Sequence, residues 1–114
     1  MGQASLTGVR AKLRVRYLDW RTAYERDTVV RHLEALALEL ERRGWRCVRT
    51  YQEVVPVRTP LLRVYGGRMA VTLCVLAVPE RRWGIHEAAR GRDGFVCHCG
   101  GDAALVVDRF LRRG

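Results

Sequence analysis

Residues 61–78 contain the pattern that most restricts the fold of this chain. Two apolar runs, residues 61–65 and 69–78, stand on either side of Gly66 and Gly67. A Gly-Gly pair supplies the positive φ angles of a tight hairpin turn, so the two runs are predicted to pair as antiparallel strands. The second run is apolar on both faces except for Thr72, which is typical of a strand covered on both sides. We therefore expect residues 69–78 to form the central strand of a sheet.

A second pattern predicts an amphipathic helix that ends near residue 43. Thr22 to Glu25 fits a capping box, with Asp27 and Thr28 as an alternative start, and Gly44 is a typical left-handed helix stop. Between these signals apolar residues recur at steps of three and four, which predicts a face that lies on the core. They are Val29, Val30, Leu33, Leu36, Ala37 and Leu40. A last helix is expected after Asp102, with Leu105, Val106, Phe110 and Leu111 facing inward.

Residues 9–17 alternate apolar and basic side chains without interruption. Successive side chains of a strand point to opposite faces, so the alternation predicts a strand with one apolar and one cationic face. The apolar members are Val9, Ala11, Leu13, Val15 and Tyr17, and the cationic members are Arg10, Lys12, Arg14 and Arg16. On a helix, at about 100° per residue, the same residues would be mixed around the surface. We therefore expect a first strand here.

The remaining apolar segments complete the expected fold. Residues 45–55, 83–86 and 95–99 resemble strands, with Pro56 and Pro60 placing the first of these at an edge or in a loop. The chain of 114 residues is expected to form one α+β domain over residues 1–114, with residues 1–8 flexible. Its predicted architecture is a two-layer sandwich: a mostly antiparallel sheet of about 4–5 strands with two helices on one face, in the order β-α-β-β-β-(β)-α.

Charge and hydropathy limit the class of protein. The net charge is +9, and the excess of cations comes almost wholly from arginine, since Lys12 is the only lysine. No apolar run approaches the roughly 20 residues that cross a bilayer, and the N-terminus lacks the apolar segment of a secretory signal. We expect a cytoplasmic protein with no membrane partner, and the positive surplus suggests an anionic one.

The cationic face of the first predicted strand carries the main functional hypothesis. Its side chains would stand about 6–7 Å apart, a spacing close to that of successive phosphates along a nucleic-acid strand. The predicted contacts are Arg10, Lys12, Arg14 and Arg16, helped by Arg46, Arg49 and Arg63 if their strands show the same sheet face. Such contacts would be salt-dependent and weakly sequence-specific. The structural alternative is an edge strand whose cations only prevent aggregation.

Two further functions stay open. The first is a protein-interaction or self-associating module that uses the open sheet face or edge around Trp45, Tyr51, Val54 and Val55, because such an edge can extend into a partner's sheet, including that of a homodimer.

The second is a thiol- or zinc-dependent activity around residues 97–99. On a strand Cys97 and Cys99 share one face and His98 takes the other, which disfavours a metal site made by these three alone. Without a pair of acid and base carboxylates or a phosphate-binding glycine loop, we expect a non-enzymatic module with no metal and no cofactor.

The aromatic residues offer one more possibility. Trp and Tyr side chains can stack on bases, although in most proteins they pack in or beside the core. The set consists of Tyr17, Trp20, Tyr24, Trp45, Tyr51, Tyr65 and Trp83. It shows no aromatic repeat at strand spacing.

Overall fold

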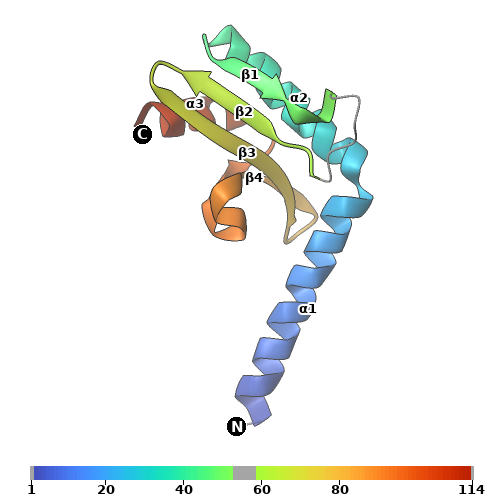
Figure 1. Cartoon of the computed structure of the whole chain (residues 1–114). Helices are drawn as coiled ribbons and strands as arrows, with labels where there is room; N and C mark the ends of the chain where they lie inside the picture. Colours follow the sequence, from blue (N-terminus) through green and yellow to red (C-terminus); the bar gives the residue numbers. More distant parts are fainter. Residues whose placement is uncertain (1, 53–58, 114) are drawn as a thin grey trace.

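The computed structural model describes residues 2–52 and 59–113, with side chains from residue 8 onward. The chain is an α+β protein in which two N-terminal helices precede a five-stranded sheet and a third helix ends the fold (Figure 1). The helices are α1 (Gly2–Tyr24), α2 (Arg26–Arg42) and α3 (Ala103–Arg113). The strands are β1 (Arg46–Arg49), β2 (Leu62–Gly66), β3 (Met69–Val78), β4 (Arg82–Glu87) and β5 (Phe95–His98). Short 3-10 segments, η1 (Thr50–Gln52) and η2 (Ala88–Gly94), follow β1 and β4.

The sheet is antiparallel and its strands lie in chain order, β1-β2-β3-β4-β5. The hairpin predicted from the Gly-Gly pair is confirmed, because Gly66 pairs with Met69 and Gly67 takes the positive φ of the turn. The central position of β3 is confirmed as well. Both edge strands are short, which limits the unpaired backbone that they present to other chains.

Both α2 and α3 cover the same face of the sheet, behind the strands in Figure 1, as expected. Every residue of the predicted α2 stripe except the half-buried Val30 is buried. On the sheet side the core takes alternate residues of β3, Leu73, Val75 and Ala77. The apolar face of α2 and the face of β3 formed by alternate residues therefore pack together in one apolar layer.

The prediction of a strand over residues 9–17 is wrong. These residues lie within α1, so the observed order is α-α-β-β-β-β-β-α rather than one that begins with a strand. Strict alternation includes residues four apart, so Val9, Leu13 and Tyr17 also fall on one side of a helix. The segment is rich in Ala, Leu, Arg and Lys, which are good helix formers. The C-terminal half of the helix then finds tertiary contacts that a strand would not make.

Those contacts lie at the edge of β3 beyond the end of β2. Thr22 accepts a hydrogen bond from the Ala77 backbone N–H (2.9 Å) and donates one to the Leu18 carbonyl (2.8 Å). The Ala77 carbonyl accepts from Arg92 of η2 (2.8 Å), whose guanidinium also pairs with Asp19 (2.7 Å). Thr22 is therefore an interior residue of α1 rather than the cap of the next helix. The next helix, α2, begins at Arg26 without a side-chain cap.

Smaller differences concern the ends of elements. The strand expected over residues 45–55 is observed only as β1, after which η1 turns the chain. In α3 the buried residues are Val107, Asp108 and Leu111, whereas Val106 is exposed. The predicted start after Asp102 is confirmed, and so are two inward residues, because Leu111 is buried and Phe110 packs against the core. Val106 was predicted to face inward, but its neighbour Val107 is buried instead.

Candidate functional site

The N-terminal half of α1 projects away from the rest of the protein and carries a dense group of free cations (Figure 1). We call Arg10, Lys12, Arg14 and Arg16 the α1 cations. All four are exposed, and among the described side chains no carboxylate forms an ion pair with them. The sequence contains no Asp or Glu among residues 1–18, so this part of the helix has no acidic residue of its own to neutralise them.

The helix arranges the α1 cations in two pairs. Residues four apart lie near one another on a helix, so Arg10 stands with Arg14, and Lys12 stands with Arg16. At about 100° per residue the two pairs lie on different sides of the helix. The single ridge that the sequence predicted is therefore absent, and the same four cations form two flanks instead.

The sector of the helix that separates the two flanks carries a row of exposed apolar and aromatic side chains: Val9 and Leu13 lie between the cations, and the rings follow at and beyond their C-terminal end. We call Tyr17, Trp20 and Tyr24 the aromatic row, which Leu13 and Val9 continue toward the N-terminus. Neighbouring rings of the row are stacked, with centroids 6.2 Å apart for Tyr17 and Trp20 and 5.0 Å apart for Trp20 and Tyr24. Such an exposed apolar row on a small protein is typical of an interaction site. The three rings belong to the set named above as able to stack on bases, but their arrangement in one row was not predicted, although their spacing of three and four residues is typical of one face of a helix.

The sheet brings together only two of the three other predicted cations. Arg63 lies opposite Val48 of β1, so Arg63 and Arg46 show the same face, away from α2 and α3. Both are exposed, with Tyr65 opposite Arg46. Arg49 pairs with the buried Leu62 and therefore points toward the helices. The condition of a shared face holds for Arg46 and Arg63 and fails for Arg49.

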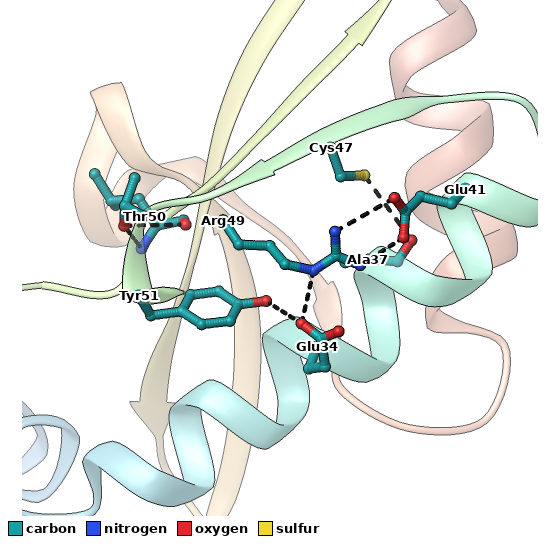
Figure 2. Close-up of polar contacts among 8 residues, drawn as sticks. Glu34, Ala37, Glu41, Cys47, Arg49, Thr50 and Tyr51 are labelled. Atoms are coloured by element: carbon teal, nitrogen blue, oxygen red, sulfur yellow. Dashed lines mark hydrogen bonds and ion pairs between the residues drawn. The ribbon is translucent and has the colours of Figure 1, made fainter. Parts of the chain in front are cut away.

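Arg49 belongs to an ion-pair network that joins β1 to α2 (Figure 2). Its guanidinium lies 2.7 Å from a Glu34 carboxylate oxygen and 2.5 Å from one of Glu41. Tyr51 donates a hydrogen bond to Glu34 (2.7 Å). The hydrogen bond to Glu41, followed by those to Glu34, raises the pKa of Arg49, and the same contact with Arg49 lowers the pKa of Glu41. This arginine is structural, because two carboxylates already occupy its donors.

Replacing Arg49 by methionine is expected to lower the free energy of unfolding by about 2 kcal/mol, since charge-assisted hydrogen bonds are lost while both carboxylates stay close together. Urea unfolding followed by circular dichroism measures it. The matched control is Arg46→Met, on the exposed face of the same strand, with an expected change within about 0.5 kcal/mol.

The contribution of Arg49 also depends on pH. The pKa of Glu41 is lowered from its ordinary 4.5, so this stabilisation is present above that pH and is lost as the pH falls through the lowered pKa. The difference in the free energy of unfolding between the wild type and Arg49→Met should therefore become smaller at acid pH. A constant difference at every pH would contradict the assigned network.

The predicted interaction surface is only partly exposed. Trp45 is half-buried and donates its indole N–H to Asp108 of α3 (2.7 Å), and Tyr51 is half-buried beside Glu34. Both side chains therefore join the sheet to the helix layer. Val54 and Val55 lie outside the described residues. The exposed apolar residue of β1 is Val48, on the opposite face.

The cysteines are packed side chains with raised thiol pKa values. Cys97 and Cys99 pack against the core and His98 lies on the other face, as the strand pattern predicted. Burial raises the pKa of the Cys99 thiol to about 12 and those of Cys47 and Cys74 to about 11, which disfavours the thiolate form. Within residues 2–52 and 59–113 no three His, Cys, Asp or Glu side chains gather closely enough to hold a metal ion.

His86 is the most enclosed titratable group of the opposite sheet face. It is 2% exposed, its Nδ1 lies 3.0 Å from the Gly84 carbonyl oxygen, and Phe95 packs edge-on against its ring. Burial lowers the pKa of His86, so the neutral imidazole is favoured. These contacts, with Gly84 of β4 and Phe95 of β5, explain His86 as a packed residue of the sheet.

A cavity of about 540 Å³ lies where α2 and α3 both end, beside the β2–β3 turn, and its lining includes Arg43, Arg68 and Arg112. The Arg112 guanidinium lies over the Trp45 ring, 5.6 Å from its centroid, and also pairs with Asp108 (3.0 Å). Arginines at helix C-termini complement the partial negative charge of the last carbonyls. Helix-end chemistry thus accounts for two of these three cations.

Comparison with known proteins finds no matching family model, no matching curated protein and no matching solved structure. Across the described residues, no helix combines the length and the apolar character that crossing a bilayer requires.

Proposed function

We propose that this protein is a small, non-enzymatic nucleic-acid-binding module in which α1 contacts the phosphates. One observation carries the proposal: the α1 cations are exposed on a projecting helix, and residues 1–18 of the chain include no Asp or Glu. Elsewhere the acidic side chains neutralise many of the arginines within the described chain, among them Arg21, Arg42, Arg49, Arg92 and Arg112. The positive potential is thus concentrated where a polyanion can reach it.

The chemistry of these side chains suits phosphates. Three of the four α1 cations are arginines, whose planar guanidinium can bind two phosphate oxygens at once. The cations also form two flanks along the helix, which suits a ligand with repeated charges better than a single small anion. Arg46 and Arg63 on the open sheet face offer a second, smaller basic surface. Contacts of this kind neutralise phosphates without reading sequence.

The test is a fourfold variant, Arg10→Gln, Lys12→Gln, Arg14→Gln and Arg16→Gln, measured by fluorescence anisotropy with labelled oligonucleotides at several salt concentrations. Each phosphate contact adds about 0.9 to the slope of log affinity against log salt for a duplex and about 0.7 for a single strand. The variant should therefore lose about 3 from the slope and on the order of 100-fold in affinity near 0.1 M salt.

The matched control removes the same amount of charge elsewhere. Arg68, Arg90, Arg109 and Arg113 are exposed residues of the β2–β3 turn, η2 and α3, and changing all four to Gln also lowers the net charge from +9 by four. This control is expected to keep most of the affinity and of the salt dependence. Equal losses in both variants, or wild-type binding that ignores salt, would overturn the proposal.

A protein-binding module is the second candidate, favoured by the exposed apolar row of α1. Its partner would be another protein rather than a second copy of this chain, because two α1 helices side by side would bring the eight α1 cations of both copies together, with Asp19 as the single carboxylate of each helix. Absence of wild-type binding to oligonucleotides at low salt, together with a monomer in sedimentation, would favour this candidate over the first.

A further inference from the structure

The aromatic row has a geometry that the phosphate contacts do not explain. Tyr17, Trp20 and Tyr24 are 58%, 57% and 75% exposed, so all three rings stand largely in water. Their planes are nearly parallel, with interplanar angles of 28° between the first two and 16° between the last two. Large aromatic side chains usually bury most of their surface, so three exposed rings in one row call for a ligand.

The row begins beside Arg16 and continues toward the C-terminus of α1, in the sector of the helix that separates the two pairs of α1 cations. Measured around the helix from Trp20 at about 100° per residue, Tyr17 and Tyr24 fall within about 60° on one side. Arg16 and then Lys12 follow on the other side of Trp20, and Arg10 and Arg14 lie just beyond Tyr17. The opposite side of the helix carries Leu18 and Thr22, which contact the core and β3. Docking on the sheet therefore leaves the rings and the cations facing solvent together.

We infer that α1 binds single-stranded nucleic acid, with bases stacking on the aromatic row and the α1 cations holding the phosphates. This inference rests on the proposed function and names its substrate class. Stacking on aromatic side chains requires bases whose faces are free, which a single strand offers and a duplex does not. A stack of nearly parallel rings can be extended by a base at either end. Cations beside the rings would then meet the backbone that joins those bases.

An anionic membrane surface is the competing partner for a helix with aromatic and basic residues. Helices that lie in a membrane interface bury a broad apolar face made of Leu, Phe and Trp. The exposed row of α1 includes two tyrosines with polar hydroxyl groups and a single leucine, Leu13, and cations adjoin it on both sides. This composition suits a flat stacking surface better than insertion among lipid chains.

The experiment compares a single-stranded oligothymidine with a DNA hairpin duplex that has the same number of phosphates, at one salt concentration. The wild-type protein should bind the single strand at least 10-fold more tightly. Trp20→Leu keeps an apolar side chain but removes the flat ring. It should lower the affinity for the single strand about 10-fold, because stacking contributes about 1–3 kcal/mol per base. Its affinity for the duplex and its salt slope should not change.

Phe95→Leu is the matched control, because Phe95 is an exposed ring, 45% exposed, on β5. It should leave both affinities unchanged, and circular dichroism of each variant checks that α1 and the sheet are intact.

Each outcome separates this inference from the proposed function. Salt-dependent binding that is equal for single strand and duplex and unaffected by Trp20→Leu would overturn the inference and leave the proposed function standing. Absence of binding to either oligonucleotide would overturn both. Vesicles of phosphatidylglycerol and phosphatidylcholine form the last arm. Tighter binding to these vesicles than to oligothymidine, weakened by Trp20→Leu, would overturn the inference in favour of a membrane surface.

Discussion

Leu33→Ala is expected to lower the free energy of unfolding by about 4 kcal/mol. Leu33 is fully buried in the middle of α2, within the layer where the helices meet the sheet. Its truncation removes apolar surface from the core and leaves a cavity that rigid strands on one side cannot close. Urea unfolding at 25 °C, followed by circular dichroism, measures the change.

The matched control for this prediction lies in the same helix. Leu38 is 49% exposed, so Leu38→Ala opens no cavity. It is the same Leu→Ala change in the same helix, so the change in helix propensity is equal for the two variants. We expect its effect to stay within about 0.5 kcal/mol. Equal effects of the two substitutions would mean that α2 does not present the face that the fold assigns to it.

The second large effect is expected from Gly66→Ala, at about 3 kcal/mol. A Cβ atom at Gly66 would overlap the six-membered ring of Trp45. The ring cannot simply swing away, because its indole N–H is bonded to Asp108 (2.7 Å) and the Arg112 guanidinium lies over it. The substitution must therefore move the ring, break that hydrogen bond or shift the hairpin, and each of these costs stability.

A double-mutant cycle tests this explanation. In a Trp45→Leu background the ring is absent, so Gly66→Ala should cost much less than it does in the wild type. Gly67→Ala serves as the control, because a Cβ there meets nothing within 4 Å and only the positive φ of 59° is unfavourable. That control is expected to cost about 1 kcal/mol. A cost of Gly66→Ala that is unchanged by removal of the Trp45 ring would refute the proposed overlap.

The candidate site was predictable in its residue types and unpredictable in its arrangement. That Arg10, Lys12, Arg14 and Arg16 lie at the surface follows from their charge, since such side chains are almost never buried without partners. Their grouping into two flanks around a row of rings depends on the helix, which the strict alternation of residues 9–17 did not indicate. The structural role of Arg49 could not be predicted from the sequence for another reason. Its carboxylate partners, Glu34 and Glu41, lie on a different element and approach it only when β1 packs on α2.

Local signals alone were sufficient for the hairpin, the central strand and the buried face of α2. In α2 one period dominates and Gly44 marks the end, so a single face is apolar. In the hairpin the Gly-Gly pair marks the turn, and the unbroken apolar run that follows it, bounded by Pro79, indicates a strand covered on both sides.

Local signals do not distinguish a helix from a strand in residues 9–17. Residues that alternate along a strand include residues four apart, so the same apolar side chains share a face in either structure. The tertiary structure supplies the missing information. Beyond the end of β2 the edge of β3 is open, so the Ala77 backbone N–H and carbonyl have no strand partner on that side. Thr22 and Arg92 bond to those two groups, and Asp19 holds Arg92 in place. These contacts hold the C-terminal half of α1 at the open edge of β3, and the helix in turn sets which side chains face water.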